Sequence, residues 1–145
     1  MIISFDLDDT LIPGTKSFDT EDQNLLQRLA GIEKIRKGTI GLFKQLRSRG
    51  HCIYIYTTSF RPTLKAKLMF MSYGIPVNKV INQQCHDQEL KGNKARCSKF
   101  PPAFGIDIHV DDSIGVKMEG EKFNFKTIII EENGVNWTET ILKIV

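Results

Sequence analysis

The sequence has little of what marks secreted, disulfide-bonded or membrane-spanning proteins. It contains only 3 cysteines in 145 residues, and an odd number at these spacings provides no disulfide framework. Such cysteine usage favours a reducing compartment, so we expect a cytoplasmic protein. No segment approaches the ~18 unbroken apolar residues that cross a bilayer. We therefore expect no membrane partner.

Two further absences narrow the class of protein. The N-terminus has neither the basic segment nor the small-residue cleavage site of a signal peptide, so we expect Asp6 to remain in the mature chain. The charge excess is small, at a formal +3. It permits an anionic substrate but does not indicate nucleic-acid binding. The length suits one domain, residues 1–145, with a genuine hydrophobic core.

The most informative stretch is the N-terminal one, MIISFDLDDTL, in which apolar residues lead into three carboxylates and a hydroxyl. This pattern is typical of a buried parallel strand with an exposed C-terminal tip, where open α/β sheets bind ligands. Because residues two apart share a face of a strand, Asp6 and Asp8 can face one ligand. A divalent cation would relieve their repulsion, and hard oxygen ligands suit Mg²⁺. The alternative is an acidic loop without a ligand.

Buried-strand patterns recur along the chain. After the N-terminal run we predict strands over residues 52–56, 77–81, 106–110 and 125–130. Helical patterns separate several of these strands, which implies right-handed βαβ units and a parallel sheet. The expected fold class is therefore α/β, a three-layer Rossmann-like fold whose central parallel sheet has about five strands.

The helices are predicted from apolar spacing and capping residues. We predict a helix over residues 21–30 with Thr20 as N-cap, and a helix over 39–49. Another helix opens at Arg61-Pro62, and a closing helix contains Trp137. The polar segment 83–98 is predicted to be a loop with at most one helical turn, and Pro101-Pro102 to break any helix there. The predicted inward-facing residues of three helices are Leu25, Leu26 and Leu29, then Leu42, Phe43 and Leu46, then Leu64, Leu68 and Met71.

Three of the predicted strands end in polar clusters. These clusters are Asp6 to Thr10, Thr57 to Ser59, and Asp111 to Ser113. In a parallel sheet the strand tips lie along one edge, so the three clusters should converge. Convergence of separated clusters indicates a site more strongly than any one cluster does.

These same clusters resemble a known family. Phe5-Asp6-Leu7-Asp8-Asp9-Thr10-Leu11 resembles the first motif of the haloacid dehalogenase superfamily, whose members are mostly phosphatases. Tyr54-Ile55-Tyr56-Thr57 is similar to its second motif, a strand that ends in Thr or Ser. His109-Val110-Asp111-Asp112 is similar to its fourth motif, a strand that ends in paired acids.

The third family motif is a lysine between those two. Lys99 in the stretch KFPPAF is similar to a common family form, Lys-Pro-x-Pro followed by an aromatic residue. Lys94 is an alternative, and Lys91 a weaker one. The resemblance implies that this lysine neutralises charge developing on a transferred phosphoryl group.

The resemblance also implies roles for the other residues. Asp6 would be the nucleophile that forms an aspartyl-phosphate, and Asp8 the general acid and base. Mg²⁺ would be held by Asp6, Asp111 and the backbone carbonyl of Asp8, with Asp112 assisting directly or through water. The Thr57 hydroxyl would hold a phosphoryl oxygen. The implied activity is hydrolysis of a phosphomonoester whose identity the sequence does not give.

Family members often carry a cap domain over the site. Here the insertion after the first motif spans only about residues 12–38, too short for a separate domain. A nearly capless, open site would admit bulky substrates or need a second subunit, in a homo-oligomer, to close it. Two alternatives stay open: a binding or regulatory module with little turnover, and a nucleic-acid-end phosphatase that uses the basic stretch 91–99.

Other candidate residues fit no pattern. The spacing of Cys85, His86 and Cys97 matches no standard zinc motif, which argues against zinc. His51 and His109 lie beside or within predicted strands, and we interpret both as packing or surface residues.

Overall fold

The centre of the computed structural model, which describes residues 1–91 and 96–145, is a five-stranded sheet. The strands are β1 (Ile2–Phe5), β2 (Cys52–Tyr56), β3 (Lys79–Ile81), β4 (Ile108–Asp111) and β5 (Lys126–Ile129). Their order is β3-β2-β1-β4-β5, and every neighbouring pair is parallel. The predicted fold class, α/β with a parallel sheet of about five strands, is confirmed. Because β1 and β4 are central neighbours, their C-terminal ends lie side by side.

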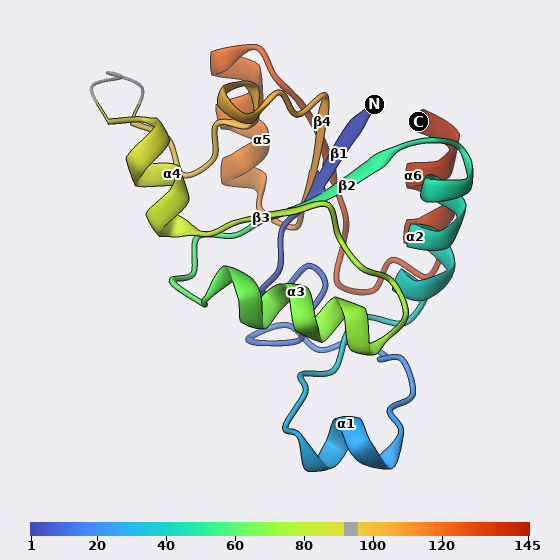
Figure 1. Cartoon of the computed structure of the whole chain (residues 1–145). Helices are drawn as coiled ribbons and strands as arrows, with labels where there is room; N and C mark the ends of the chain where they lie inside the picture. The colour runs from blue at the N-terminus through green and yellow to red at the C-terminus, as the bar shows by residue number, and fades with distance from the viewer. Residues whose placement is uncertain (92–95) are drawn as a thin grey trace.

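Helices cover both faces of this sheet, which gives three layers (Figure 1). On one face pack α2 (Thr39–Ser48), α3 (Thr63–Ser72) and α6 (Trp137–Ile144), whose buried side chains join the main hydrophobic core. On the other face lie α4 (Gln83–Glu89), the 3₁₀ helix η1 (Pro101–Phe104) and α5 (Ile114–Phe123). The short helix α1 (Leu25–Leu29) lies away from the sheet, next to α3 (Figure 1).

Side-chain alternation in the central strands decides which face carries polar chemistry. Ile3, Phe5 and Val110 point into the main core, on the side of α2, α3 and α6. Ser4 and His109 point to the opposite face, where they are fully buried. Asp6 and Asp111 continue these two rows, two residues further along each strand. The face covered by α4 and α5 therefore receives the buried polar side chains.

The prediction for α1 was wrong in its start and in its buried face. The helix begins at Leu25 with Asn24 as N-cap, in a capping box with Gln27, and Thr20 does not cap it. Its three leucines at 25, 26 and 29 are exposed, whereas Gln27 is buried and donates to the carbonyl and hydroxyl oxygens of Ser72. The helix lies in the insertion, which offers no sheet to pack against, so polar contacts anchor it.

The prediction for α3 was right in position but wrong in orientation. Residues 64, 68 and 71 are exposed, and the buried residues are Ala66, Met69 and Phe70. The helix has apolar residues on nearly every side, so its periodicity does not define which face packs on the sheet. For α2 the prediction of Leu42, Phe43 and Leu46 as buried is confirmed.

Two helices on the face of the sheet opposite the main core, α4 and α5, were not predicted. The segment predicted as loop contains α4, whose N-cap Asn82 accepts a hydrogen bond from the Cys85 backbone at 2.9 Å. Helix α5 was not predicted, because Gly115 and Gly120 interrupt its pattern and its apolar face is small. The two prolines after Phe100 begin η1 rather than prevent it. In the described part of the chain, no helix is both long and apolar enough to cross a bilayer.

Candidate active site

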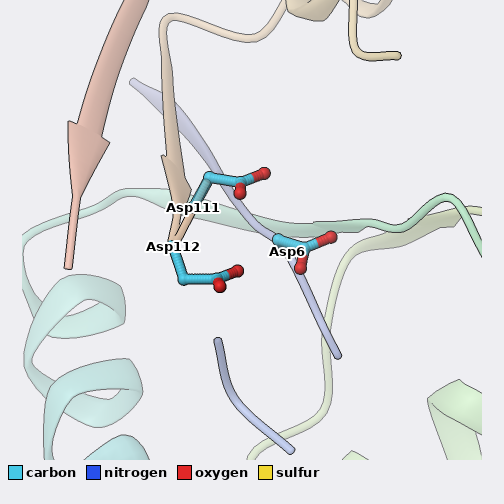
Figure 2. Close-up of side chains that lie close together, drawn as sticks. All are labelled: Asp6, Asp111 and Asp112. Carbon is cyan, nitrogen blue, oxygen red and sulfur yellow. The ribbon is translucent and has the colours of Figure 1, made fainter. Parts of the chain in front are cut away.

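Three carboxylates meet at the adjacent ends of β1 and β4 (Figure 2). Asp6 follows β1, and its backbone N–H donates to the Val110 carbonyl at 2.8 Å, which ties it to the neighbouring strand. Asp111 is the last residue of β4, and Asp112 follows it. One oxygen of each carboxylate lies within 4.8 Å of the others. The predicted convergence of the first and fourth motifs is therefore present in the fold.

This donor set fits a magnesium ion. Ligand oxygens around octahedral Mg²⁺ lie roughly 3 to 4 Å apart, so small side-chain rotations of the three acids would suffice. Hard carboxylate oxygens without sulfur or imidazole in the set favour Mg²⁺ over zinc. Two of the acids are almost completely buried, Asp6 at 8% and Asp111 at 2% exposure. Buried carboxylates this close together are costly without a compensating cation.

Lys99 supplies one such cation inside the protein. Its Nζ lies 2.6 Å from Asp6 Oδ1 and 3.9 Å from Asp111 Oδ2, and it also donates to the Tyr56 carbonyl. Its side chain is 2% exposed, so Lys99 is buried inside the site and is not a solvated surface lysine. Glu119 of α5 positions it by accepting hydrogen bonds from the Ser98 and Lys99 backbones at 2.7 and 3.2 Å. The alternative Lys94 lies outside the described residues.

Burial and the nearby charges shift the acidities of the two buried carboxyls in opposite directions. Burial raises the pKa of Asp6 from 3.8 to about 6, with Asp111 adding to the rise and Lys99 opposing it. Burial alone would raise the pKa of Asp111, but the hydrogen bond from His109 and the charge of Lys99 hold that pKa below its ordinary value. Asp111 is thus the more strongly ionised member of the pair.

Because of this shift, Mg²⁺ held by these acids would bind with an affinity that depends on pH. A carboxyl whose folded pKa is raised is protonated as pH falls through that value, and a protonated carboxyl is a poor metal ligand. At pH 5, one unit below the pKa of about 6 for Asp6, affinity should be about tenfold weaker than well above pH 6. Calorimetric titration in buffers of different ionisation enthalpy should also detect proton release near pH 6. Equal proton release by Asp6→Asn would contradict this assignment.

Behind Asp111 lies a buried chain of hydrogen bonds. His109 Nε2 lies 3.0 Å from Asp111 Oδ2, and His109 Nδ1 lies 2.7 Å from Ser4 Oγ. Burial lowers the pKa of His109 to about 4, so the ring is neutral near pH 7. An ionised carboxylate only accepts, so Nε2 carries the proton and Nδ1 accepts from Ser4. The Asp111 carboxylate is therefore fixed from behind, with its other oxygen accepting from the Ser113 N–H at 2.9 Å.

Replacing His109 by phenylalanine should weaken Mg²⁺ binding by roughly 10- to 100-fold, the usual effect of losing a hydrogen bond behind a metal ligand. His109→Gln, which can still donate to Asp111, should restore most of the affinity. Calorimetric titration with Mg²⁺ measures both. If the phenylalanine variant folded normally and bound Mg²⁺ as the parent does, the hydrogen bond would have no role in holding the metal.

A second group of side chains surrounds Asp8. Its carboxylate does not join the three acids but lies 3.5 Å from Thr57 Oγ1 and faces the guanidinium of Arg61 at 3.3 and 3.4 Å. Thr57 is buried at the end of β2, whereas the Asp8 side chain is about half exposed. The Ser59 N–H donates to Thr57 Oγ1 at 3.1 Å, which fixes the loop after β2. Asp8 thus has the most exposed side chain of the four aspartates.

The loop after the first motif adds another cation. Asp9 adopts a left-handed conformation (φ 63°), and its carboxylate accepts hydrogen bonds from Gly14, Thr15 and Lys16. This fold of the loop brings Lys16 Nζ to 2.5 Å from Asp112 Oδ2. Asp112 also accepts from the Thr10 hydroxyl at 2.9 Å.

The sequence-predicted residues are thus divided between two parts of one site. Lys99 joins the three acids, whereas Thr57 and the Asp8 carboxylate lie beside them. Sequence reasoning missed the contribution of His109, which we had interpreted as packing or surface, and the positions of Arg61 and Lys16. For His109 a signal was available, because it lies two residues before Asp111 and so shares its face of the strand. For Arg61 and Lys16 no signal was present in the sequence.

The residues considered for zinc have other contacts. His86 Nδ1 lies 2.5 Å from the hydroxyl oxygen of the buried Tyr56. Among residues 1–91 and 96–145, the group with metal-ligand geometry is the three-aspartate cluster.

No family model and no curated protein matches the sequence. The fold is similar to chains of two solved structures, described as a Pnkp1/Rnl/Hen1 complex and as the Pnkp1/Rnl/Hen1 RNA repair complex. Both comparisons have a TM-score of 0.55 and cover 90% of this chain, at 14% and 13% sequence identity. The chain spans only 45% and 42% of the lengths of those chains. At such identities the likeness shows the fold alone.

Proposed function

We propose that this protein is a Mg²⁺-dependent phosphomonoester hydrolase that acts through an aspartyl-phosphate on Asp6. The observation that carries the proposal is the meeting of Asp6, Asp111, Asp112 and the buried Lys99 at adjacent strand ends. A phosphate dianion and an attacking carboxylate together carry three negative charges, which a metal and a fixed positive charge would offset. A cluster of acids with a buried lysine suits such a reaction, because the acids can hold the metal and the lysine is the fixed charge. The resemblance of the four sequence motifs to the haloacid dehalogenase superfamily supports the same chemistry.

In the first step an oxygen of Asp6 attacks the phosphorus and the ester P–O bond breaks. The departing oxygen keeps the bonding electron pair and takes a proton from Asp8. The half exposure of the Asp8 carboxylate supports this role, because a leaving group could reach it from solvent. Lys99 neutralises charge on the transferring oxygens, and the Thr57 hydroxyl donates to one of them. Asp6, Asp111 and Asp112 would hold Mg²⁺, which when bound would offset the negative charges of the nucleophile and the phosphate.

In the second step a water molecule attacks the phosphorus of the aspartyl-phosphate. Asp8, now ionised, takes the proton from the water as its oxygen bonds to phosphorus, and the bond to Asp6 breaks. Inorganic phosphate leaves, and both aspartates return to their initial states. The Lys99 contact at 2.6 Å then holds Asp6 in position for the next cycle.

Hydrolysis of p-nitrophenyl phosphate tests this proposal. We expect turnover that requires Mg²⁺, disappears with a chelator and returns when Mg²⁺ is restored. The contrasting class of function is a binding or regulatory module that keeps the fold without turnover. A folded protein that binds Mg²⁺ but hydrolyses no phosphomonoester would favour that class over the enzyme.

A nucleic-acid-end phosphatase is a narrower candidate within the enzyme class. It is favoured by the presence of an RNA repair complex among the structures of similar fold. Oligonucleotides with a terminal phosphate test it directly, because binding through the phosphate backbone gives steep salt dependence. Turnover of such ends that is no faster than that of p-nitrophenyl phosphate, and insensitive to salt, would count against this candidate.

A further inference from the structure

Arg61 lies beside the proposed general acid and is held there from two sides. Its guanidinium nitrogens lie 3.3 and 3.4 Å from the two oxygens of Asp8 and 3.0 Å from Glu33 Oε1. Asp8 belongs to the reaction centre, whereas Glu33 belongs to the insertion after the first motif. The Arg61 side chain is 17% exposed, so it is partly accessible to solvent.

The main chain of Arg61 is anchored independently of these ion pairs. Asn82, at the start of α4, donates its side-chain amide to the Arg61 carbonyl at 3.1 Å. Glu33 is fixed as well, because its backbone carbonyl accepts from the Tyr73 hydroxyl at 2.8 Å. If the guanidinium released Asp8, Glu33 and the anchored backbone would still keep it at the mouth of the site.

The positions of the three site cations differ in a way that bears on the substrate. Lys99 contacts Asp6, and Lys16 contacts Asp112, so both lie where the phosphoryl group and the metal would bind. Arg61 contacts Asp8, the group that would protonate the leaving oxygen. In an in-line displacement that oxygen points away from Asp6. Arg61 therefore lies on the side of the leaving group.

The contacts between Arg61 and Asp8 are long for charged hydrogen bonds, and the Asp8 side chain is half exposed. Partly exposed ion pairs of this kind contribute little to stability and are readily exchanged for another anion. A carboxylate or phosphate that presents two oxygens is the partner that a guanidinium binds best. Exchange would also free Asp8 to approach the leaving oxygen.

We propose that Arg61 binds a second anionic group carried by the leaving group. This rests on the proposed function and adds a substrate class to it. The preferred substrates are phosphomonoesters with a second carboxylate or phosphate close to the ester oxygen. Arg61 is thus a specificity-determining residue, and Glu33 is the residue that keeps it in place.

Matched substrate pairs test the proposal. Phosphoglycolate and ethylene glycol monophosphate differ by a carboxylate on the leaving group. A nucleoside 3′,5′-bisphosphate and the corresponding 3′-monophosphate differ by a second phosphate, so the two pairs separate the two sources of charge. We expect the member with the second anionic group to have a higher kcat/KM in at least one pair, by about tenfold or more, since hydrogen bonds to charged groups have this strength.

The variant Arg61→Gln should remove that preference. We expect its kcat/KM to fall about 10- to 100-fold more for the substrate with the second anionic group than for the member of the pair that lacks it. The loss should lie mainly in KM, because the second anion does not react. Arg61→Lys should retain part of the preference, and Arg28→Gln, at an exposed arginine of α1, should retain all of it.

Three outcomes would overturn this inference while leaving the proposed function intact. These are a wild-type enzyme without preference in either pair, an equal loss for both members in Arg61→Gln, and no loss at all. An equal loss would assign Arg61 to the phosphoryl group or to Asp8 itself. Absence of any Asp6-dependent turnover of p-nitrophenyl phosphate by the wild-type protein would instead overturn the proposed function, and this inference with it.

Discussion

Asp6→Asn should lower Mg²⁺-dependent phosphatase turnover by at least about 10⁴-fold, the scale seen when a catalytic nucleophile is removed. Asparagine has the same shape, but its amide does not attack phosphorus as a carboxylate does. The substitution also removes one of the three proposed metal ligands and the anionic partner that Lys99 contacts at 2.6 Å. Initial rates with p-nitrophenyl phosphate, measured at several Mg²⁺ concentrations, give the size of the loss.

A matched control is available at the other end of the same sheet. Asp107 precedes β4 and accepts a hydrogen bond from the Ile2 backbone at 2.7 Å, at the edge remote from the strand tips. Asp107→Asn should therefore leave kcat within about a few-fold of the wild type, in keeping with surface substitutions away from a site. Turnover that survived Asp6→Asn would exclude the aspartyl-phosphate mechanism, provided that thermal denaturation showed both variants to be folded.

Lys99→Met should cause the second-largest change, and in two quantities at once. The substitution leaves the buried carboxylates of Asp6 and Asp111 without their shared cation. Breaking a buried ion pair by removing one partner costs on the order of 3 kcal/mol of unfolding free energy. Loss of a preorganised positive group at the phosphoryl oxygens should lower kcat about 10²- to 10³-fold. Urea denaturation and initial rates measure the two effects separately.

Magnesium distinguishes this explanation from simple damage to the fold. Since Mg²⁺ would bind the same two carboxylates, it should recover part of the lost stability of Lys99→Met but little of the lost activity. Lys91→Met and Lys94→Met serve as controls, because the sequence left both lysines as alternatives. If Lys94→Met reduced turnover and Lys99→Met did not, the assignment of the phosphate-binding lysine would have to be reversed.

The parts of the fold that were predictable are those in which a short sequence signal decides the outcome. A buried parallel strand is a run of apolar residues with a polar end, so β1, β2 and β4 could be recognised one by one. The order of the elements then implied a parallel sheet, and the sheet placed Asp6 and Asp111 at one edge. No tertiary contact had to be known to predict that these two acids meet.

The helices show where such reasoning fails. Helix α3 is apolar on most sides, so only packing against the sheet decides that Met69 and Phe70 are buried and Leu68 is exposed. In α1 the rule that leucines point inward failed, because the insertion has no core of its own. Helix α5 has two glycines and a small apolar face, yet it forms in the connection from β4 to β5.

The same difference between predictable and unpredictable parts applies to the residues of the site. Residues that belong to strand tips could be predicted, whereas those brought in by loops could not. Lys99, which contacts Asp6, has its backbone held by Glu119 of α5, a contact between elements that carry no shared motif. The ion pairs of Arg61 with Asp8 and Glu33 depend on where the loop after β2 meets the insertion. These contacts depend on the tertiary fold, so a local sequence pattern does not predict them.

The central claim is that one Mg²⁺ is shared by the acids of β1 and β4 while Asp6 remains free to accept a phosphoryl group. A crystal structure of the protein with Mg²⁺ and beryllofluoride, a mimic of the phosphoryl group, tests it most directly. We predict beryllofluoride bonded to a carboxylate oxygen of Asp6, with Mg²⁺ between that group and Asp111. Beryllofluoride on any other residue, or a metal ion bound away from Asp6 and Asp111, would contradict it.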